Sequence, residues 1–216
     1  MMELDQELNK RGAKLYLLVY PNKEQIYSQY MPDTIYRHSE YSKGRQLHDF
    51  LTQYTNIPMI YPYEELEETS KNYPVFYKAD THANRIGAFV AFQEFMKERY
   101  GENQTINDMS VNVKYEGFSG DLAVLTKVNA TKERDTVYTL DGADPNLWKD
   151  ETILFVGDSF TGYLSNIAEM YYPRVHRIDS ILFTMEYVDV LKPDIVIYEA
   201  GERRIEYFET EDLYSK

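Results

Sequence analysis

Two kinds of hydrophobic pattern alternate along this chain. Short continuous apolar runs, ended by proline, glycine or charged residues, are typical of strands buried on both faces of a parallel sheet. They predict strands at Lys14–Pro21, Ile57–Pro62, Glu151–Ser159, Val175–Asp179 and Pro193–Gly201. Stretches with helical spacing of apolar residues predict helices at Ser39–Thr55, Asn84–Gly101, Thr161–Tyr172 and Ser180–Lys192. This alternation predicts an α/β fold whose mainly parallel sheet is covered by helices on both faces.

The helix expected at residues 84–101 has the clearest boundaries. Apolar residues between Ile86 and Met96 lie on one broad face. Asn84 is suited to begin the helix, because its side-chain oxygen can accept a hydrogen bond from a free backbone N–H in the first turn. Gly101 is suited to end it, because glycine adopts the left-handed conformation without a steric penalty.

The segment from Glu102 to Asp150 carries a weaker pattern. It is richer in Thr, Asn, Asp and Gly, and it predicts an inserted loop region or a β-hairpin around VNVKYEGFSGDLAVL. Neither a linker nor an internal repeat divides the chain. We therefore expect residues 1–216 to form one domain, a length sufficient for a sizeable hydrophobic core.

Charge and composition exclude several classes of function. The formal net charge is −13 at pH 7, so nucleic acid and anionic membrane surfaces are repelled and are not expected as partners. The chain has no cysteine, which removes disulfides, thiolate zinc sites and cysteine nucleophiles. Neither a P-loop nor a G-x-G-x-x-G motif indicates a nucleotide site. The opening MMELDQELNKRG is too polar for a signal peptide, which suits a cytosolic protein or a portion without its targeting region.

Candidate chemistry begins in ILFVGDSFTGY, Ile153–Tyr163, where a strand is expected to turn into a helix. Ligands of open α/β sheets bind outside the carboxyl ends of the strands, and free N–H groups at a helix start can stabilise an oxyanion. Ser159 could therefore be a nucleophile. Asp158 or Ser159 could equally be an ordinary helix cap, which the tripeptide Gly-Asp-Ser taken alone favours.

A serine nucleophile needs a base that is oriented by an acid. Among the histidines, His38, His48 and His176 have no evident acidic partner at a useful spacing, whereas His82 follows Asp80 by two residues in ADTHAN. In a loop, this spacing lets the carboxylate reach one ring nitrogen and leaves the other free for a serine. Asp-Thr-His together with Gly-Asp-Ser, in an α/β pattern, favours a catalytic triad.

The motifs YKADTHANRIGAFVAFQEFM, GFSGDLAVL, ILFVGDSF and PDIVIYEAGERR, in this order, resemble the SGNH-like acyltransferases related to the alginate O-acetyltransferases AlgJ and AlgX, including the DHHW family. The resemblance covers most of the chain. In ordinary SGNH esterases the serine block comes first, whereas here the Asp/His pair precedes the serine, as in the alginate acetyltransferase branch. The resemblance implies a three-layer α/β/α sandwich with this permuted motif order. The chain departs from the family at Ala83, where relatives usually have tryptophan after the histidine.

The resemblance implies a role for each matching residue of the triad. Ser159 is expected to accept the acetyl group, His82 to act as general base and Asp80 to orient the imidazole. The backbone N–H of Ser159 is expected to donate one hydrogen bond to the oxyanion.

Further contacts to the substrate or oxyanion are expected from Gly120, Tyr163 and Arg203. Arg203 has an alternative role as an ion-pair partner of Glu199 or Glu202. No cofactor is expected, and no metal site, because the sequence shows no third clustered ligand beside Asp80 and His82.

The expected function is transfer of acetyl through a serine acyl-enzyme to hydroxyls of an extracellular or cell-wall polysaccharide. The resemblance also implies an acetyl donor delivered by a membrane acyltransferase and a location at the cell surface or in the periplasm, with the full-length protein associated with the membrane. Two alternatives stay open: an acetyl esterase with the same triad, and a non-catalytic glycan-binding assembly subunit. The net charge disfavours a polyanionic acceptor.

Overall fold

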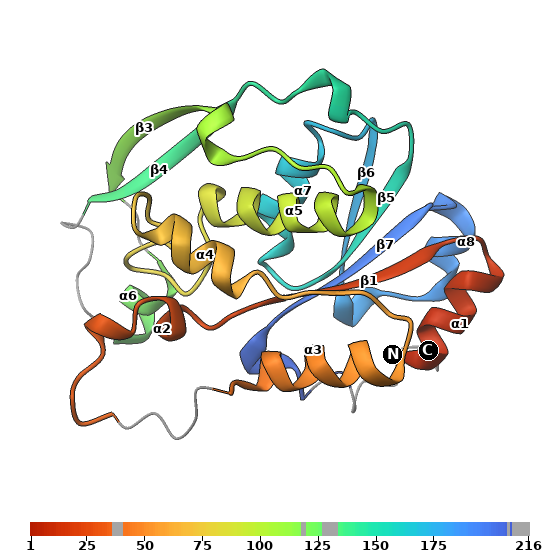
Figure 1. Ribbon diagram of the computed structural model, residues 1–216, viewed down its shortest axis with the longest axis horizontal. Coiled ribbons are helices and arrows are strands. Elements are labelled where there is room, and N and C mark those ends of the chain that lie inside the picture. The colour runs from red at the N-terminus through yellow and green to blue at the C-terminus, as the bar shows by residue number, and fades with distance from the viewer. Residues whose placement is uncertain (36–40, 118–119, 127–133, 207, 209–216) are drawn as a thin grey trace.

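The computed structural model describes residues 1–35, 41–117, 120–126, 134–206 and 208 (Figure 1). Its central feature is a five-stranded parallel sheet with the strand order β2-β1-β7-β5-β6. The strands are β2 (Met59–Ile60), β1 (Lys14–Tyr20), β7 (Ile195–Gly201), β5 (Thr152–Gly157) and β6 (Arg174–Asp179). All five predicted strands are therefore present. Four are shorter than predicted, and β6 begins one residue earlier, at Arg174.

Burial explains the sequence pattern of these strands. The three central strands β1, β7 and β5 are buried along almost their whole length, whereas residues of the edge strand β6 are exposed or half-buried. A strand covered on both faces needs apolar side chains at every position, which gives a continuous run instead of an alternation. Leu15, Leu17, Ile153 and Ile197 are all fully buried.

Two hydrophobic cores lie on opposite faces of the sheet. One core packs α5 (Arg85–Tyr100) and α7 (Thr161–Ala168) against one face. The other packs α1 (Met2–Lys10), α3 (Lys43–Tyr54) and α8 (Met185–Leu191) against the opposite face. Figure 1 shows α5 and α4 (Tyr63–Ser70) on one side of the sheet and α3 on the other. The α/β fold with layers α/β/α is thus confirmed.

Helix α5 has the ends that the sequence predicts. The Asn84 side chain accepts hydrogen bonds from the N–H groups of Ile86 (2.9 Å) and Gly87 (3.1 Å), and Gly101 ends the helix with φ +70°. Its residues from Ile86 to Phe92 are all buried, so the helix is covered on nearly every side. Each fully buried phenylalanine contributes about 1.5–3 kcal/mol relative to an exposed one.

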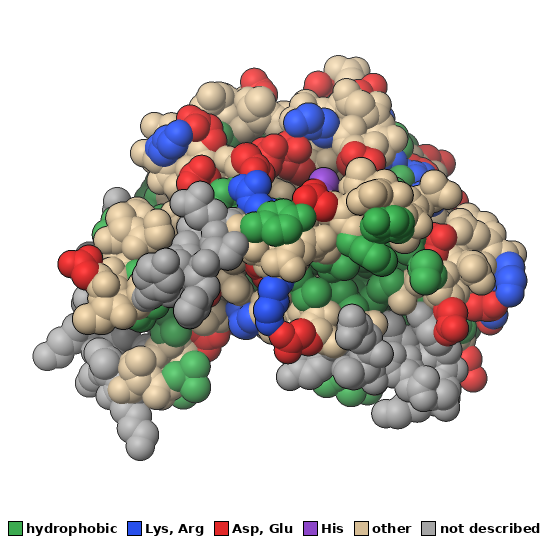
Figure 2. Space-filling view, turned by 60° about the horizontal axis from the view of Figure 1, so that its bottom comes forward, with side chains coloured by type: hydrophobic (Ala, Val, Ile, Leu, Met, Phe, Trp, Pro, Cys, Tyr) green, Lys and Arg blue, Asp and Glu red, His purple; other side chains and the backbone are tan. Residues whose placement is uncertain are grey.

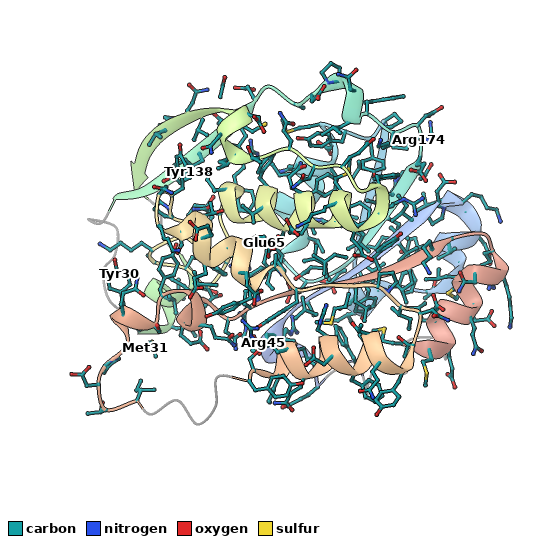
Figure 3. The ribbon with its side chains drawn as sticks, in the orientation of Figure 1. Tyr30, Met31, Arg45, Glu65, Tyr138 and Arg174 are labelled. Atoms are coloured by element: carbon teal, nitrogen blue, oxygen red, sulfur yellow. The ribbon has the colours of Figure 1, made fainter. Side chains whose placement is uncertain are left out.

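The segment between α5 and β5 forms a second, two-stranded antiparallel sheet. Strand β3 (Ser110–Gly117) pairs with β4 (Arg134–Asp141), and the short helix α6 (Asp121–Thr126) lies between them in sequence. Figure 3 labels Tyr138 of β4, which belongs to the same core as α5. The prediction of a hairpin around VNVKYEGFSGDLAVL is therefore wrong in detail. The last residues of this stretch are helical, and the strand that pairs with its first residues comes later in the chain. Phe118 and Ser119 lie outside the described residues.

Several elements were not predicted from the pattern. They are α1, α4 and the short α2 (Lys23–Ile26), all of which carry many polar residues. Beyond β7, the buried carboxylate of Glu202 accepts hydrogen bonds from Gly44 N (2.8 Å), Gln25 Nε2 (2.6 Å) and the Tyr61 hydroxyl (2.9 Å). It thereby joins the carboxyl end of the sheet to α2 and α3. Among the described residues, no helix is both long enough and apolar enough to cross a membrane.

Candidate active site

The turn after β5 presents Ser159 at the carboxyl end of the sheet. Asp158 closes this turn: its side chain accepts a hydrogen bond from Phe160 N (2.9 Å), and its carbonyl accepts from the Thr161 hydroxyl (2.6 Å). Arg204, beyond β7, donates to the other Asp158 carboxylate oxygen at 3.0 Å. The helix cap that the sequence left open is therefore neither Asp158 nor Ser159, because Phe160 precedes the first residue of α7 and the helix has no side-chain cap. Asp158 holds the turn before the helix, and the hydroxyl of Ser159 remains available.

Ser159 faces a histidine from a distant part of the chain. Its side chain is exposed, and its Oγ lies 2.5 Å from His82 Nε2. The other ring nitrogen, His82 Nδ1, is hydrogen-bonded to Asp80 Oδ1. The structure therefore brings together all three residues of the predicted triad, in the order serine, imidazole, carboxylate. This is the geometry in which a base can take the serine proton while an acid holds its tautomer.

The loop that carries Asp80 and His82 is tied down from several sides. The ammonium group of Lys23, in α2, donates to the carbonyls of Tyr77 (2.6 Å), Lys78 (2.9 Å) and Asp80 (2.9 Å). The Tyr77 N–H donates to His82 O at 3.1 Å, which closes the loop on itself. Because the Lys23 ammonium group binds several carbonyls of the loop, the loop keeps its conformation without regular secondary structure.

The environment of Asp80 favours its charged form. Burial alone would raise the pKa of this carboxyl, but hydrogen bonds from the His82 ring, the His82 N–H (2.8 Å) and the Asp121 N–H (3.0 Å) lower it to about 2. The hydrogen bond to Asp80 in turn raises the pKa of His82, against the effect of its partial burial, and the charges of Asp80, Asp121 and Asp158 act in the same direction. The imidazolium that forms during catalysis is thus stabilised.

Asp121 is a site residue that sequence reasoning missed. It is the first residue of α6, and its carboxylate accepts hydrogen bonds from Thr81 N (2.7 Å) and from the Thr81 hydroxyl. Its Oδ2 lies 3.8 Å from His82 Nδ1. The only signal in the sequence is its place directly after Gly120 in FSGD, one of the motifs that carry the family resemblance.

Asp121 also supplies the third clustered ligand that the sequence did not show. The ligand atoms of Asp80, His82 and Asp121 lie within 4.8 Å of one another, so that reason for expecting no metal site was wrong. The carboxylate oxygens of both aspartates and His82 Nδ1 already hold hydrogen-bond partners within the loop. A cation would have to displace them, and we assign the three groups to the hydrogen-bond network instead.

The other predicted contacts have different surroundings. Gly120 packs against the backbone of Ala79, where an added Cβ would lie 2.1 Å from the carbonyl oxygen. The Tyr163 ring packs on Tyr77, with 5.8 Å between their centroids. Direct contacts of Gly120, Tyr163 and Arg203 to substrate stay predictions.

Arg203 stacks on an aromatic ring that borders the histidine. Its guanidinium lies 5.4 Å from the ring centroid of Phe160, and that ring lies 4.6 Å from the ring of His82. Within the described residues it forms no ion pair with Glu199 or Glu202. The alternative role of Arg203 as an ion-pair partner is therefore not seen.

The remaining histidines lie outside this arrangement. His48, in α3, is 3.5 Å from its neighbour Asp49, and His176 is half-buried in β6. His38 lies outside the described residues. Ala83, where relatives usually have tryptophan, is buried and pairs with Phe76 in a β-bridge. The substitution leaves the hydrogen bonds of His82 in place.

Comparisons with known proteins identify the family and the fold. The family model for the SGNH hydrolase-like domain of the acetyltransferase AlgX matches residues 1–165, a range that includes Asp80, His82 and Ser159. No curated protein sequence matches the chain.

Three solved structures share the fold. The O-acetyltransferase domain of Pseudomonas putida AlgJ superposes with a TM-score of 0.69 at 21% identity, over 93% of this chain and 79% of that one. A DHHW family protein from Eubacterium siraeum gives a TM-score of 0.69 at 14% identity, over 94% and 84% of the two chains. Pseudomonas aeruginosa AlgX gives 0.63 at 15% identity, over 92% of this chain and 55% of its own.

The family match covers well over half of the sequence, and the neighbours have the fold that this family implies. The chain therefore belongs to the AlgX family of SGNH hydrolase-like acetyltransferase domains.

Proposed function

We propose that the chain is an O-acetyltransferase that carries acetyl on Ser159 and passes it to hydroxyl groups of an extracellular or cell-wall polysaccharide. One observation carries the proposal: the 2.5 Å contact between Ser159 Oγ and His82 Nε2, with His82 Nδ1 held by Asp80. Membership of an acetyltransferase family supports the nature of the acyl group.

The first half-reaction transfers acetyl to the enzyme. Ser159 Oγ attacks the carbonyl carbon of the acetyl donor while His82 Nε2 takes the serine proton, which gives a tetrahedral oxyanion. The N–H of Ser159 donates no hydrogen bond within the described residues, and it is the candidate oxyanion donor. The intermediate then collapses, the bond to the donor breaks, and His82 gives its proton to the leaving group. Acetyl-Ser159 and neutral His82 remain.

The second half-reaction uses the same groups in reverse. A sugar hydroxyl loses its proton to His82 Nε2 as its oxygen attacks the acetyl carbonyl, and a second oxyanion forms. Its collapse breaks the bond to Ser159 Oγ, which takes the proton back from His82. The products are an acetylated sugar and free enzyme. The Asp80 carboxylate stabilises the imidazolium in both halves without itself accepting a proton, in keeping with its low pKa of about 2.

The acceptor and the donor are inferred from charge and family. Acidic and basic side chains are mixed over the face shown in Figure 2, but the net charge of −13 slows the approach of a polyanion. A neutral or amino-bearing polysaccharide suits this charge better. The acetyl donor is a membrane acyltransferase, and the chain acts at the cell surface or in the periplasm as part of a membrane-associated protein. These parts rest on the family resemblance alone.

A second function, hydrolysis of acetyl esters, is favoured by the exposure of Ser159. Water that reaches an exposed acyl-enzyme can replace the sugar hydroxyl, because both nucleophiles use the same base and oxyanion site. Partition of the acetyl group between sugar and water therefore decides between transferase and esterase.

The test is the intact mass of the protein after incubation with 4-nitrophenyl acetate, with and without neutral oligosaccharides. The wild type is expected to gain one acetyl group, which is lost faster when an acceptor is present and appears on the sugar. Ser159→Ala is expected to gain none, whereas Ser28→Ala, which removes another exposed serine, behaves as the wild type. No adduct and no ester turnover in the wild type would overturn the proposal in favour of a non-catalytic glycan-binding subunit.

A further inference from the structure

A second carboxylate, that of Asp121, lies behind the imidazole of His82. It comes from α6, which Figure 1 shows beside α2 at the end of the sheet where the triad loop lies. Asp121 is both a hydrogen-bond donor and an acceptor toward the loop. Its N–H donates to Asp80 Oδ2 at 3.0 Å, and its carboxylate accepts from the N–H of Thr81 at 2.7 Å and from the Thr81 hydroxyl. Helix α6 and the loop are thus joined at successive residues.

These hydrogen bonds hold the carboxylate of Asp80 and Thr81, the single residue that separates acid from base. Thr81 stands between Asp80 and His82, so a clamp on its N–H and hydroxyl restricts the rotation that would carry the imidazole away from Ser159. Hydrogen bonds to a charged acceptor are stronger than those between neutral groups, by about a factor of two. The clamp also places a second negative charge 3.8 Å from His82 Nδ1.

Charged groups of several described segments surround His82. They are Asp80 on its own loop, Asp121 on α6, Asp158 after β5, Lys23 on the carbonyls of the loop, and Arg203 across the ring of Phe160. Of Asp121 and Asp158, it is Asp121 whose carboxylate also accepts hydrogen bonds from the loop in the part of the chain that the structure describes.

We propose that Asp121 is a positioning residue for His82, holding the Asp80–Thr81–His82 segment in the conformation that points Nε2 at Ser159. This inference rests on the proposed function, because the imidazole is positioned for acyl transfer. Asp121 does not touch the acyl group: it acts through Thr81 and Asp80, and its charge favours the protonated state of the imidazole.

The test compares Asp121→Asn and Asp121→Ala with Asp108→Asn. Asp108 makes the same kind of clamp, accepting from Thr105 N (2.9 Å) and Thr105 Oγ1 (2.7 Å), on the 3₁₀ helix that precedes β3. For ester hydrolysis we expect kcat/KM to fall about 10-fold in Asp121→Asn and about 100-fold in Asp121→Ala, as for a displacement near 1 Å, with the loss in kcat. Asp108→Asn retains wild-type kinetics. Wild-type kcat in both Asp121 variants overturns the proposal.

A readout independent of turnover separates this inference from the proposed function. The ring signals of His82, followed by NMR from pH 5 to pH 9, give its pKa in each folded variant. Removing the Asp121 charge is expected to lower that pKa, and the acid limb of kcat/KM shifts to lower pH with it. An unchanged His82 titration in Asp121→Asn counts against the positioning role, even if the wild type proves inactive. Failure of the wild type to form an acyl adduct counts against the proposed function, whatever the titration shows.

Discussion

Gly120 has no room for a side chain, and adding one moves the triad loop. A Cβ built on Gly120 would lie 2.1 Å from Ala79 O, and 2.6 Å from both Ala79 C and Asp80 Cβ. The contact with Ala79 O is a contact with the backbone, which cannot move out of the way by a simple rotation as a flexible side chain can. Gly120→Ala therefore changes the position of the loop while it keeps the backbone N–H of residue 120.

The size of the effect follows from these distances. Non-bonded carbon atoms pack best at about 3.5–4.0 Å, so the Ala79–Asp80 peptide must move by about 1 Å to accept the new methyl group. A misplacement of about 1 Å at a catalytic group can lower the rate about 100-fold. Overpacking of this kind also costs about 1–3 kcal/mol of stability. Since the shift acts on Asp80 and His82, we expect kcat to fall while KM for a small ester stays near its wild-type value.

The assay is steady-state hydrolysis of 4-nitrophenyl acetate, with thermal unfolding measured on the same samples. Gly201→Ala is the matched control: it lies at the end of β7, its φ of −70° suits alanine, and the nearest atom to its new Cβ is Arg203 Nη1 at 3.6 Å. It should retain wild-type kcat. Wild-type kcat in Gly120→Ala as well would show that the packing of Gly120 on the loop does not hold the triad in place.

Three further expectations concern charge at the site. The raised pKa of His82 places the acid limb of kcat/KM above pH 6.5, and a pH–rate profile with its limb at or below 6.5 contradicts the hydrogen bond to Asp80 as the cause. Lys23→Met leaves three carbonyls without their cation, so the free energy of unfolding should fall by about 1.5–3 kcal/mol in urea, against no change in Lys14→Met, whose single contact is 3.5 Å long. Burial, and then the charge of Asp158, raise the pKa of Glu199 well above its ordinary value, so the folded state binds this proton more tightly than the unfolded chain. As pH rises above 4.5, the wild type should therefore lose more stability than Glu199→Gln, by up to about 1.4 kcal/mol per pH unit; parallel stability profiles from urea unfolding would rule this out.

The parts of the fold that sequence predicts are those set by local pattern. Continuous apolar runs predicted β1, β5 and β7 because strands covered on both faces leave no polar position. Asn84 and Gly101 predicted both ends of α5 because capping depends on single residues. The triad residues were found through two short motifs and a resemblance, and the hydrogen bonds among them needed the tertiary structure.

What the pattern did not predict depends on contacts between distant segments. Asp121 and Lys23 resemble ordinary surface residues in the sequence, and only the packing of α6 and α2 on the triad loop gives them a role. The sequence pattern placed α6 in a hairpin because the helix has only a few apolar residues, all of them aliphatic. The periodicity of so short an apolar run does not distinguish a helix from a strand. Strand β4 was not predicted because no short turn motif connects it to β3. Helix α6 lies between the two strands in the sequence.

Around Ser159, some polar groups have all their hydrogen-bond partners and others have none. The triad loop is fixed by charge-assisted hydrogen bonds that Lys23 donates and the Asp121 carboxylate accepts. The Glu199 carboxyl and the Tyr20 hydroxyl, both buried, hold no hydrogen-bond partner within the described residues. An added Cβ at Gly157, next to the nucleophile turn, would lie 2.6 Å from Glu199 Oε2, so this unpaired acid packs directly against that turn. A buried group without partners costs about 1–3 kcal/mol, and groups of this kind gather where function constrains the chain. The stabilising contacts therefore act on the base and its orienting acid, while the destabilising ones lie beneath the nucleophile. We therefore expect substitutions of Glu199 to be able to raise stability. Substitutions of Lys23 or Asp121 are expected instead to disturb the alignment of the catalytic residues.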